Sequence, residues 1–293
     1  MDLRILFLIM FGCFYTGWGE GLPVQYEELT SPELVAAVHL SGGTIVIPLG
    51  ILEKHGPHLP LGTDLIHVRE MVFRAVKQEF SVVFPPYYFG QIYEARHQPG
   101  TIAYSPDLVW RLLQETCDEL YRNGFRKIIL VNGHGGNAHF LSYFCQSQLS
   151  VRKNYAVILF KPEEDPVVEA KIKKLRATAT DGHAGETETS MMLAHRPDLV
   201  HLDRCRDEPG EDRNRLSGLP YADTGIWWYA RFPNHYAGDG SEAKEEIGDL
   251  ILDSGAGQLA ELIRILKQDD RILELQDRFY EAAGAPIQMF GVE

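Results

Sequence analysis

The stretch GTIVIPLGILEKHGPHLPLGTD, residues 43–64, decides the fold that we expect. Its first residues are apolar and mostly β-branched, a pattern typical of a short buried strand. Glycines and prolines then shape a loop that carries Glu53, His55 and Asp64. Side chains two apart in an extended segment point the same way, so Glu53 and His55 can face one point while Lys54 faces away. Carboxylates and imidazoles placed in this way suit a divalent metal such as zinc or manganese, and a polar surface loop is the alternative.

Helical and strand patterns alternate outward from this stretch. Helical spacing of apolar residues begins near residues 31, 64, 105 and 140, and strand patterns cover residues 43–47, 81–85, 127–131 and 154–160. Such alternation predicts a parallel sheet with helices on both faces, an α/β fold. Sites in these folds form beyond the carboxyl ends of the strands, where the polar segments of this chain lie.

A second polar segment, NGHGGN at residues 132–137, joins the strongest strand pattern to a helix. A glycine loop in this position can cradle a phosphate at the helix N-terminus. The segment lacks the spacing of the nucleotide-binding glycine motifs, however, and has a histidine at its centre. We therefore interpret His134 as a metal-binding or catalytic residue, with a structural turn as the alternative.

A third polar segment, DGHAGETETS at residues 181–190, places His183 just before a predicted helix. Glu186 and Glu188 fall in the first turn of that helix, where negative charge interacts favourably with the helix dipole. We take this explanation for Glu186 and leave it open for Glu188. The three segments together are far more specific than any one of them.

Length and composition are those of an ordinary globular protein. The chain has 293 residues, of which 45% are hydrophobic and 24% charged. No repeat or linker divides it, so we expect a single domain over residues 23–293. The net charge of −13 argues against a nucleic-acid partner, because phosphate binding needs excess Lys and Arg. The cysteines beyond the N-terminus form no CxxC pair, which supports neither a disulfide framework nor a cysteine zinc site.

Residues 1–22 have features of a secretory signal peptide. The apolar run ILFLIMF at residues 5–11 is too short to span a bilayer but fits the hydrophobic part of such a signal. A buried N-terminal strand is the alternative. Cys13 follows Phe11 and Gly12 in an imperfect match to a lipoprotein acceptor site. We expect an exported protein, periplasmic or secreted, with Cys13 as a candidate lipid anchor and without a transmembrane domain.

The three polar segments resemble those of the creatininase (creatinine amidohydrolase) family. The matching stretches are EKHGPHLPLGTD at 53–64, NGHGGN at 132–137, HAG at 183–185 and ETS at 188–190, and PGT at 99–101 and GDG at 238–240 also match. The resemblance implies a three-layer α/β/α sandwich around a mostly parallel sheet, and a homo-oligomer. It also implies two divalent metal ions, Zn²⁺ or Mn²⁺, with Fe²⁺ as a further option. The family's ligand positions fall on Glu53, His55, Asp64 and His134, with Asp64 between the ions, and its catalytic histidine falls on His183.

Two positions depart from creatininase itself. Creatininase carries a glutamate ligand two residues after the histidine of the second segment, where this chain has Gly136. The NGHGGN form resembles other branches of the family, which include formamide deformylases and a peptide-processing enzyme. Glu188 is then our candidate for the missing carboxylate. Ala95 stands where many relatives carry a histidine, with His97 as a nearby substitute, and both departures argue against creatinine as the substrate.

We expect a metal-dependent amidohydrolase that acts on a small molecule. Metal-bound hydroxide would attack a cyclic amide, formamide or small peptide bond, and His183 would protonate the departing nitrogen. Two alternatives stay open: opening of a cyclic keto-sugar by C–C cleavage, and a metal- or solute-binding envelope protein without turnover. We expect His58 to be structural, and the run IWWY at 226–229 to line a pocket, a subunit interface or the core.

Overall fold

A computed structural model describes residues 21–289, built around one parallel sheet of four strands in the order β2-β1-β3-β4. The strands are β1 (Thr44–Leu49), β2 (Val82–Val83), β3 (Lys127–Asn132) and β4 (Ala156–Leu159). The two central strands, β1 and β3, pair along their whole length, from Thr44 opposite Lys127 to Leu49 opposite Asn132. Both are almost entirely buried, as expected for continuous apolar strands with helices on both faces.

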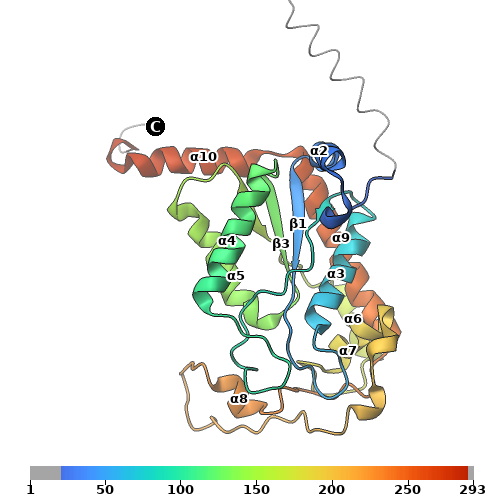
Figure 1. Cartoon of the computed structure of the whole chain (residues 1–293). Coiled ribbons are helices and arrows are strands. Elements are labelled where there is room, and N and C mark those ends of the chain that lie inside the picture. Colours follow the sequence, from blue (N-terminus) through green and yellow to red (C-terminus); the bar gives the residue numbers. More distant parts are fainter. Residues whose placement is uncertain (1–20, 290–293) are drawn as a thin grey trace, which may run out of the picture.

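Helices cover the two faces of this sheet (Figure 1). Helices α4 and α5 lie on one side, and α3 and α9 lie on the other. Helix α10 runs across one end of the molecule, and α8 lies near the opposite end. The helices are α2 (Ser31–Leu40), α3 (Thr63–Val76), α4 (Pro106–Arg122), α5 (Ala138–Ser147), α6 (Pro166–Leu175), α7 (Glu186–His195), α8 (Trp227–Arg231), α9 (Glu245–Gln268) and α10 (Arg271–Gly284).

Alternate residues of β1 divide the apolar core into two parts. Ile45 and Ile47 pack with α4 and α5, whereas Val46 packs with α3 and α9. This division follows from strand geometry, because successive side chains point to opposite faces. The predicted three-layer α/β/α sandwich is therefore confirmed.

The strand order places a crevice beyond the carboxyl ends of β1 and β3. The chain leaves β1 toward β2 on one side and leaves β3 toward β4 on the other, so the two connections diverge at this point. The start of α3 packs tightly against this edge: a Cβ on Gly50 would lie 2.3 Å from the backbone nitrogen of Leu65. The polar segments 53–64 and 132–137 consequently meet at the same edge of the sheet.

The helices expected to begin near residues 31 and 64 begin at Ser31 and Thr63. Thr30 is the N-cap of α2, where it forms a capping box with Glu33. Gly62 occupies the cap position of α3, so Asp64 lies in the first turn of that helix. From this position the carboxylate of Asp64 faces His55 and His134.

The predicted signal peptide, residues 1–22, lies outside the described residues except for Gly21 and Leu22, and so does Cys13. Within residues 21–289, no helix combines the length and the apolar character needed to cross a membrane. The three cysteines in this range, Cys117, Cys145 and Cys205, are free thiols.

Candidate metal centre

Four of the predicted ligands come together at the crevice between β1 and β3. Glu53 and His55 lie on the loop after β1, Asp64 lies at the start of α3, and His134 follows β3. All four are buried. Lys54 points away from them into an ion pair with a glutamate, as the alternation of an extended segment predicts.

One half of the cluster surrounds His134. Its Nδ1 lies 2.7 Å from Oε1 of Glu53 and 3.0 Å from Oδ2 of Asp64. Neither oxygen has a hydrogen-bond partner of good geometry within the described part of the chain, although both are buried. These three side chains can offer ligand atoms within 4.8 Å of one another, which is close enough to hold one metal ion.

The other half surrounds His55. Its Nε2 lies 2.9 Å from Oδ1 of Asp64 and 3.5 Å from Oε1 of Glu188. Its Nδ1 lies 3.3 Å from the backbone carbonyl of Glu53, which can only accept a hydrogen bond. In the neutral ring the hydrogen is thus on Nδ1, and the lone pair of Nε2 faces the carboxylates. Each oxygen of Asp64 therefore faces a different histidine, and Glu188 belongs to the cluster instead of serving only the helix dipole.

Burial and neighbouring charges shift the pKa of each of these groups in opposite directions, and the charges prevail. Burial lowers the pKa of His134, but the carboxylates of Glu53 and Asp64 outweigh it and raise the pKa to about 10. Burial raises the pKa of Glu188, but His55 outweighs it and lowers the pKa to about 2. Burial likewise opposes ionisation of Asp64, whose pKa the two histidines hold well below its usual range. In the protein alone, the protons of these histidines thus offset the charge of the carboxylates.

Divalent cations fit this arrangement because they would replace those protons. Metal ligands bind as neutral imidazoles and ionised carboxylates, and metal binding releases the protons that they carried. The cluster holds nitrogen and oxygen donors without thiolates, a set that suits zinc or manganese. The unpartnered oxygens of Glu53 and Asp64 would then gain a partner.

His183 lies beside the cluster with one nitrogen available. Its Nε2 donates to the backbone carbonyl of Lys54 at 2.8 Å, so Nδ1 carries the lone pair in the neutral ring. This Nδ1 lies 3.9 Å from Oε2 of Glu188. Burial and the neighbouring His55 lower the pKa of His183. The side chains of His183 and Glu188 are 12% and 17% exposed, whereas that of Asp64 is 2% exposed, so the cluster opens to solvent on their side.

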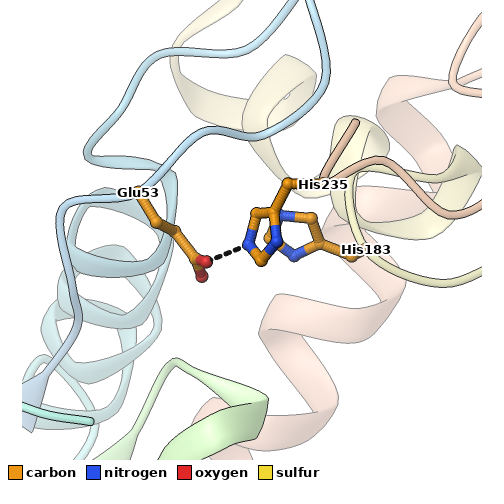
Figure 2. Close-up of side chains that lie close together, drawn as sticks. All are labelled: Glu53, His183 and His235. Atoms are coloured by element: carbon orange, nitrogen blue, oxygen red, sulfur yellow. Dashed lines mark hydrogen bonds and ion pairs between the residues drawn. The ribbon is translucent and has the colours of Figure 1, made fainter. Parts of the chain in front are cut away.

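Two histidines near the cluster were not predicted. His67 is buried on α3, and its ring joins Asp64 and Glu188 in a group of candidate ligands. Its position three residues after Asp64 on a predicted helix was a usable signal, since residues so spaced share a face. His235 is also buried, and its Nε2 contacts the carboxylate of Glu53 (Figure 2). It lies 182 residues from Glu53 in the chain, and no local pattern marks it.

Other polar candidates have structural partners. The carboxylate of Glu186 accepts hydrogen bonds from the backbone of Ala177 and Thr178 at 2.7 to 3.0 Å, so it anchors that segment instead of joining the cluster. His58 is buried, and its Nε2 lies 2.9 Å from the hydroxyl of Thr189, which fits the structural role expected of it.

The aromatic run at residues 226–229 splits between the site and the surface. Trp228 is partly buried, and its ring lies 5.9 Å from that of His183. Trp227 and Tyr229 are exposed by 42% and 38%, so core packing is wrong for them. Trp228 therefore lies beside the candidate site.

Comparison with known proteins identifies the family. The family model Creatininase, described as creatinine amidohydrolase, matches residues 27–263. This chain belongs to the creatininase family. Membership confirms the resemblance noted in the sequence and the prediction of a hydrolase of the creatininase type.

Curated relatives from this family have different activities. Creatinine amidohydrolase of Pseudomonas putida is 30% identical over 62% of this chain and 75% of its own length. The mycofactocin precursor peptide peptidase of Mycolicibacterium smegmatis is 31% identical over 54% of this chain and 60% of its own length. The 3-dehydro-scyllo-inosose hydrolase of Thermotoga maritima is 30% identical over 56% of this chain and 53% of its own length.

Solved structures of creatininase share the fold and include metal-loaded forms. A manganese form has a TM-score of 0.69 and 26% identity, covering 82% of this chain and 97% of its own. A mutant creatininase of Zn-Zn type has a TM-score of 0.70 and 26% identity, covering 83% of this chain and 98% of its own. This family member thus has candidate metal-binding groups, and its structural neighbours include manganese and zinc forms.

The two departures from creatininase have clear geometric consequences in this family member. A Cβ on Gly136 would lie 2.4 Å from Nε2 of His134 and 2.7 Å from Oε1 of Glu94, so no larger side chain fits there without rearrangement. Glu94 occupies that space, and its burial raises its pKa. His97 does not substitute for a histidine at Ala95, because its exposed ring bonds the carbonyl of Pro233 at 2.8 Å.

Proposed function

We propose that this creatininase-family enzyme hydrolyses the C–N bond of a cyclic amide, a formamide or a small peptide. Its cofactor would be two divalent ions, zinc or manganese, held by Glu53, His55, Asp64, His134 and Glu188. One observation carries this proposal: the two oxygens of Asp64 face different histidines, each with a further carboxylate beside it. A bridging carboxylate between two sets of ligands is the arrangement that a two-ion site needs.

When bound, such ions would lower the pKa of a water molecule and polarise a carbonyl oxygen. The protein's own part in proton transfer falls to His183. Its Nε2–H is fixed on the carbonyl of Lys54, which leaves Nδ1 to accept a proton and later to donate it to the departing nitrogen. Glu188, 3.9 Å from that Nδ1, would stabilise the imidazolium in between.

The site around Gly136 bears on the substrate. By the family resemblance, creatininase carries a glutamate at this position, whereas here Glu94 approaches the same space from another loop. The changed position of a carboxylate supports a substrate other than creatinine. The peptide peptidase among the relatives supports an amide or peptide substrate.

A second candidate reaction is the opening of a cyclic keto-sugar by C–C cleavage. The inosose hydrolase among the relatives favours it. The same ligands and His183 would serve both reactions, because both begin with attack of water on a carbonyl carbon. The two differ in their products, since only amide hydrolysis releases an amine.

The test is to load the purified protein with Zn²⁺ or Mn²⁺ and to supply cyclic amides, formamides, short peptides and cyclic keto-sugars in parallel. We expect amine release from an amide, and a loss of about 10²- to 10⁴-fold in kcat when His183 is replaced by Asn. His183→Asn should still hold two equivalents of metal by elemental analysis. The control is His139→Asn, because His139 is an exposed histidine that belongs to none of the groups of candidate ligands. Unchanged activity of His183→Asn, or a wild-type protein that binds no metal, would contradict the proposal.

A further inference from the structure

The two oxygens of Glu53 have different surroundings. Oε1 faces His134, on the side of the candidate metal ions. Oε2 is bonded to Nε2 of His235, which comes from the segment after α8 (Figure 2). Both side chains are buried, with 0% of Glu53 and 2% of His235 exposed. His235 therefore forms a hydrogen bond with the oxygen of Glu53 that does not face His134.

Trp228 determines which nitrogen of His235 carries the hydrogen. Its indole Nε1 lies 2.8 Å from Nδ1 of His235 and donates a hydrogen bond to it. An indole nitrogen can only donate, so Nδ1 is the acceptor, and the hydrogen of the neutral ring lies on Nε2. That hydrogen points at Glu53. The result is a directed chain of hydrogen bonds from Trp228 through His235 to Glu53.

The same assignment excludes a different role for His235. Ligand atoms of Glu53, His183 and His235 can lie within 4.8 Å of one another, as in a metal site. A ring nitrogen that carries a hydrogen has no lone pair for a metal, however. With Trp228 bound to Nδ1, His235 is a hydrogen-bond donor to a ligand and is not itself a ligand.

The backbone of His235 also has an uncommon conformation. Its φ is +53°, in the left-handed region that residues other than glycine rarely adopt. Among residues 21–289, only three other non-glycine residues have a positive φ, and one of them, Ala184, lies between His183 and the cluster's Glu188. The other two, Asn214 and Tyr221, are exposed. Strained residues of this kind persist where the surrounding structure fixes them, often at functional sites.

We infer that His235 is a positioning residue for the metal site, one that orients the carboxylate of Glu53 and is itself oriented by Trp228. This inference rests on the proposed function, since it assumes that Glu53 binds metal. Hydrogen bonds to metal ligands fix their orientation, and losing one typically costs about 10- to 100-fold in metal affinity. A segment that is distant in sequence, residues 228–235, is thus hydrogen-bonded to the loop after β1.

The test is to titrate Zn²⁺ into the metal-free full chain in competition with a chromophoric chelator. We expect His235→Leu to lose about 10- to 100-fold in affinity for Zn²⁺. His235→Gln should recover most of that loss, because its side-chain amide can donate to the same oxygen. Trp228→Phe should lie between wild type and His235→Leu. Trp227→Phe is the matched control and should equal wild type, since Trp227 is exposed and has no hydrogen bond to His235.

Wild-type affinity in His235→Leu would overturn the inference. So would an equal loss in His235→Gln and His235→Leu, because the loss would then follow from packing and not from the hydrogen bond. Circular dichroism of the metal-free variants tests their folding, and if His235→Leu is unfolded, His235→Gln and Trp228→Phe decide the matter. If wild type binds no Zn²⁺, the proposed function fails as well. If His134→Ala loses Zn²⁺ while the His235 variants keep it, only this inference fails.

Discussion

Asp64 and Asp118 both lie in polar clusters, but only one of the two clusters supplies enough hydrogen-bond donors. Asp118, on α4, accepts hydrogen bonds from Nζ of Lys153 at 2.8 Å, the hydroxyl of Tyr155 at 2.7 Å and Nε2 of Gln114 at 3.2 Å. Asp64 faces two histidines, His55 and His134, and a further carboxylate also approaches each of them. Its Oδ2 has no hydrogen-bond partner of good geometry within residues 21–289.

This difference separates a structural cluster from a binding site. Around Asp118 the donors are lysine, tyrosine and amide groups, which need nothing added to complete them. Around Asp64 the acceptors outnumber the donors, and a buried acceptor without a partner is costly. A divalent cation would supply what is missing. The positions agree with this contrast, since Tyr155 precedes the amino end of β4, whereas Asp64 lies beyond the carboxyl end of β1.

The largest difference that we expect between the two clusters is in metal binding. We expect Asp64→Asn to lower Zn²⁺ affinity by at least about 100-fold, because loss of a ligand should exceed the roughly 10- to 100-fold cost of losing a hydrogen bond to one. Catalytic activity should fall with it. Asp118→Asn, the same substitution in the other cluster, should keep both metal and activity. Elemental analysis and chelator competition measure the metal. Equal metal affinity in the two variants would remove the distinction between the clusters.

A smaller effect is expected on the stability of the wild-type protein. A ligand that binds only the folded state stabilises it, by about 2.7 kcal/mol when its free concentration is about 100 times its Kd. Zn²⁺ at this excess over its Kd should therefore raise the free energy of unfolding by about this amount, and a chelator should reverse the gain. Urea unfolding with and without metal measures it. Asp118→Asn should show the same gain, and a gain of equal size in Asp64→Asn would place the bound metal elsewhere.

Sequence patterns predicted the parts of this contrast that depend on local structure. Strands 43–47 and 127–131 were recognisable from apolar runs, and the polar residues that follow them had to meet at one edge of a parallel sheet. Asp64 and His134 were therefore within reach of prediction. The orientation of Glu53 and His55 followed from the two-residue period of an extended chain.

Residues that reach the site from distant loops could not be predicted in this way. His235 meets Glu53 through the path of a long connection between α7 and α9, and no periodicity describes such a path. Glu186 and Glu188 lie two residues apart in the same first turn of α7, yet one anchors residues 177–178 and the other faces His55. Helix position alone gives both the same favourable dipole interaction, so only the tertiary structure separates them.

The smallest effect concerns the stability that the Asp118 cluster itself contributes. Partial burial opposes ionisation of Asp118, but hydrogen bonds from Lys153 and Tyr155 outweigh it and lower its pKa. Because its side chain is 43% exposed, water screens these interactions, and we expect Asp118→Asn to cost only about 0.5–1 kcal/mol of unfolding free energy at pH 7.

A carboxyl whose pKa is lowered on folding stabilises the protein above its unfolded pKa of about 3.9 and loses this contribution as the pH falls through the folded value. The difference between wild type and Asp118→Asn should therefore stay constant from pH 7 to about pH 5 and shrink below about pH 4. Urea unfolding of the two metal-free proteins across this range measures it, so that metal binding does not contribute and the other cluster cancels in the difference. A difference that grew on acidification would mean that Asp118 is held by its neighbours in the protonated form, and its cluster would then lack donors as the other one does.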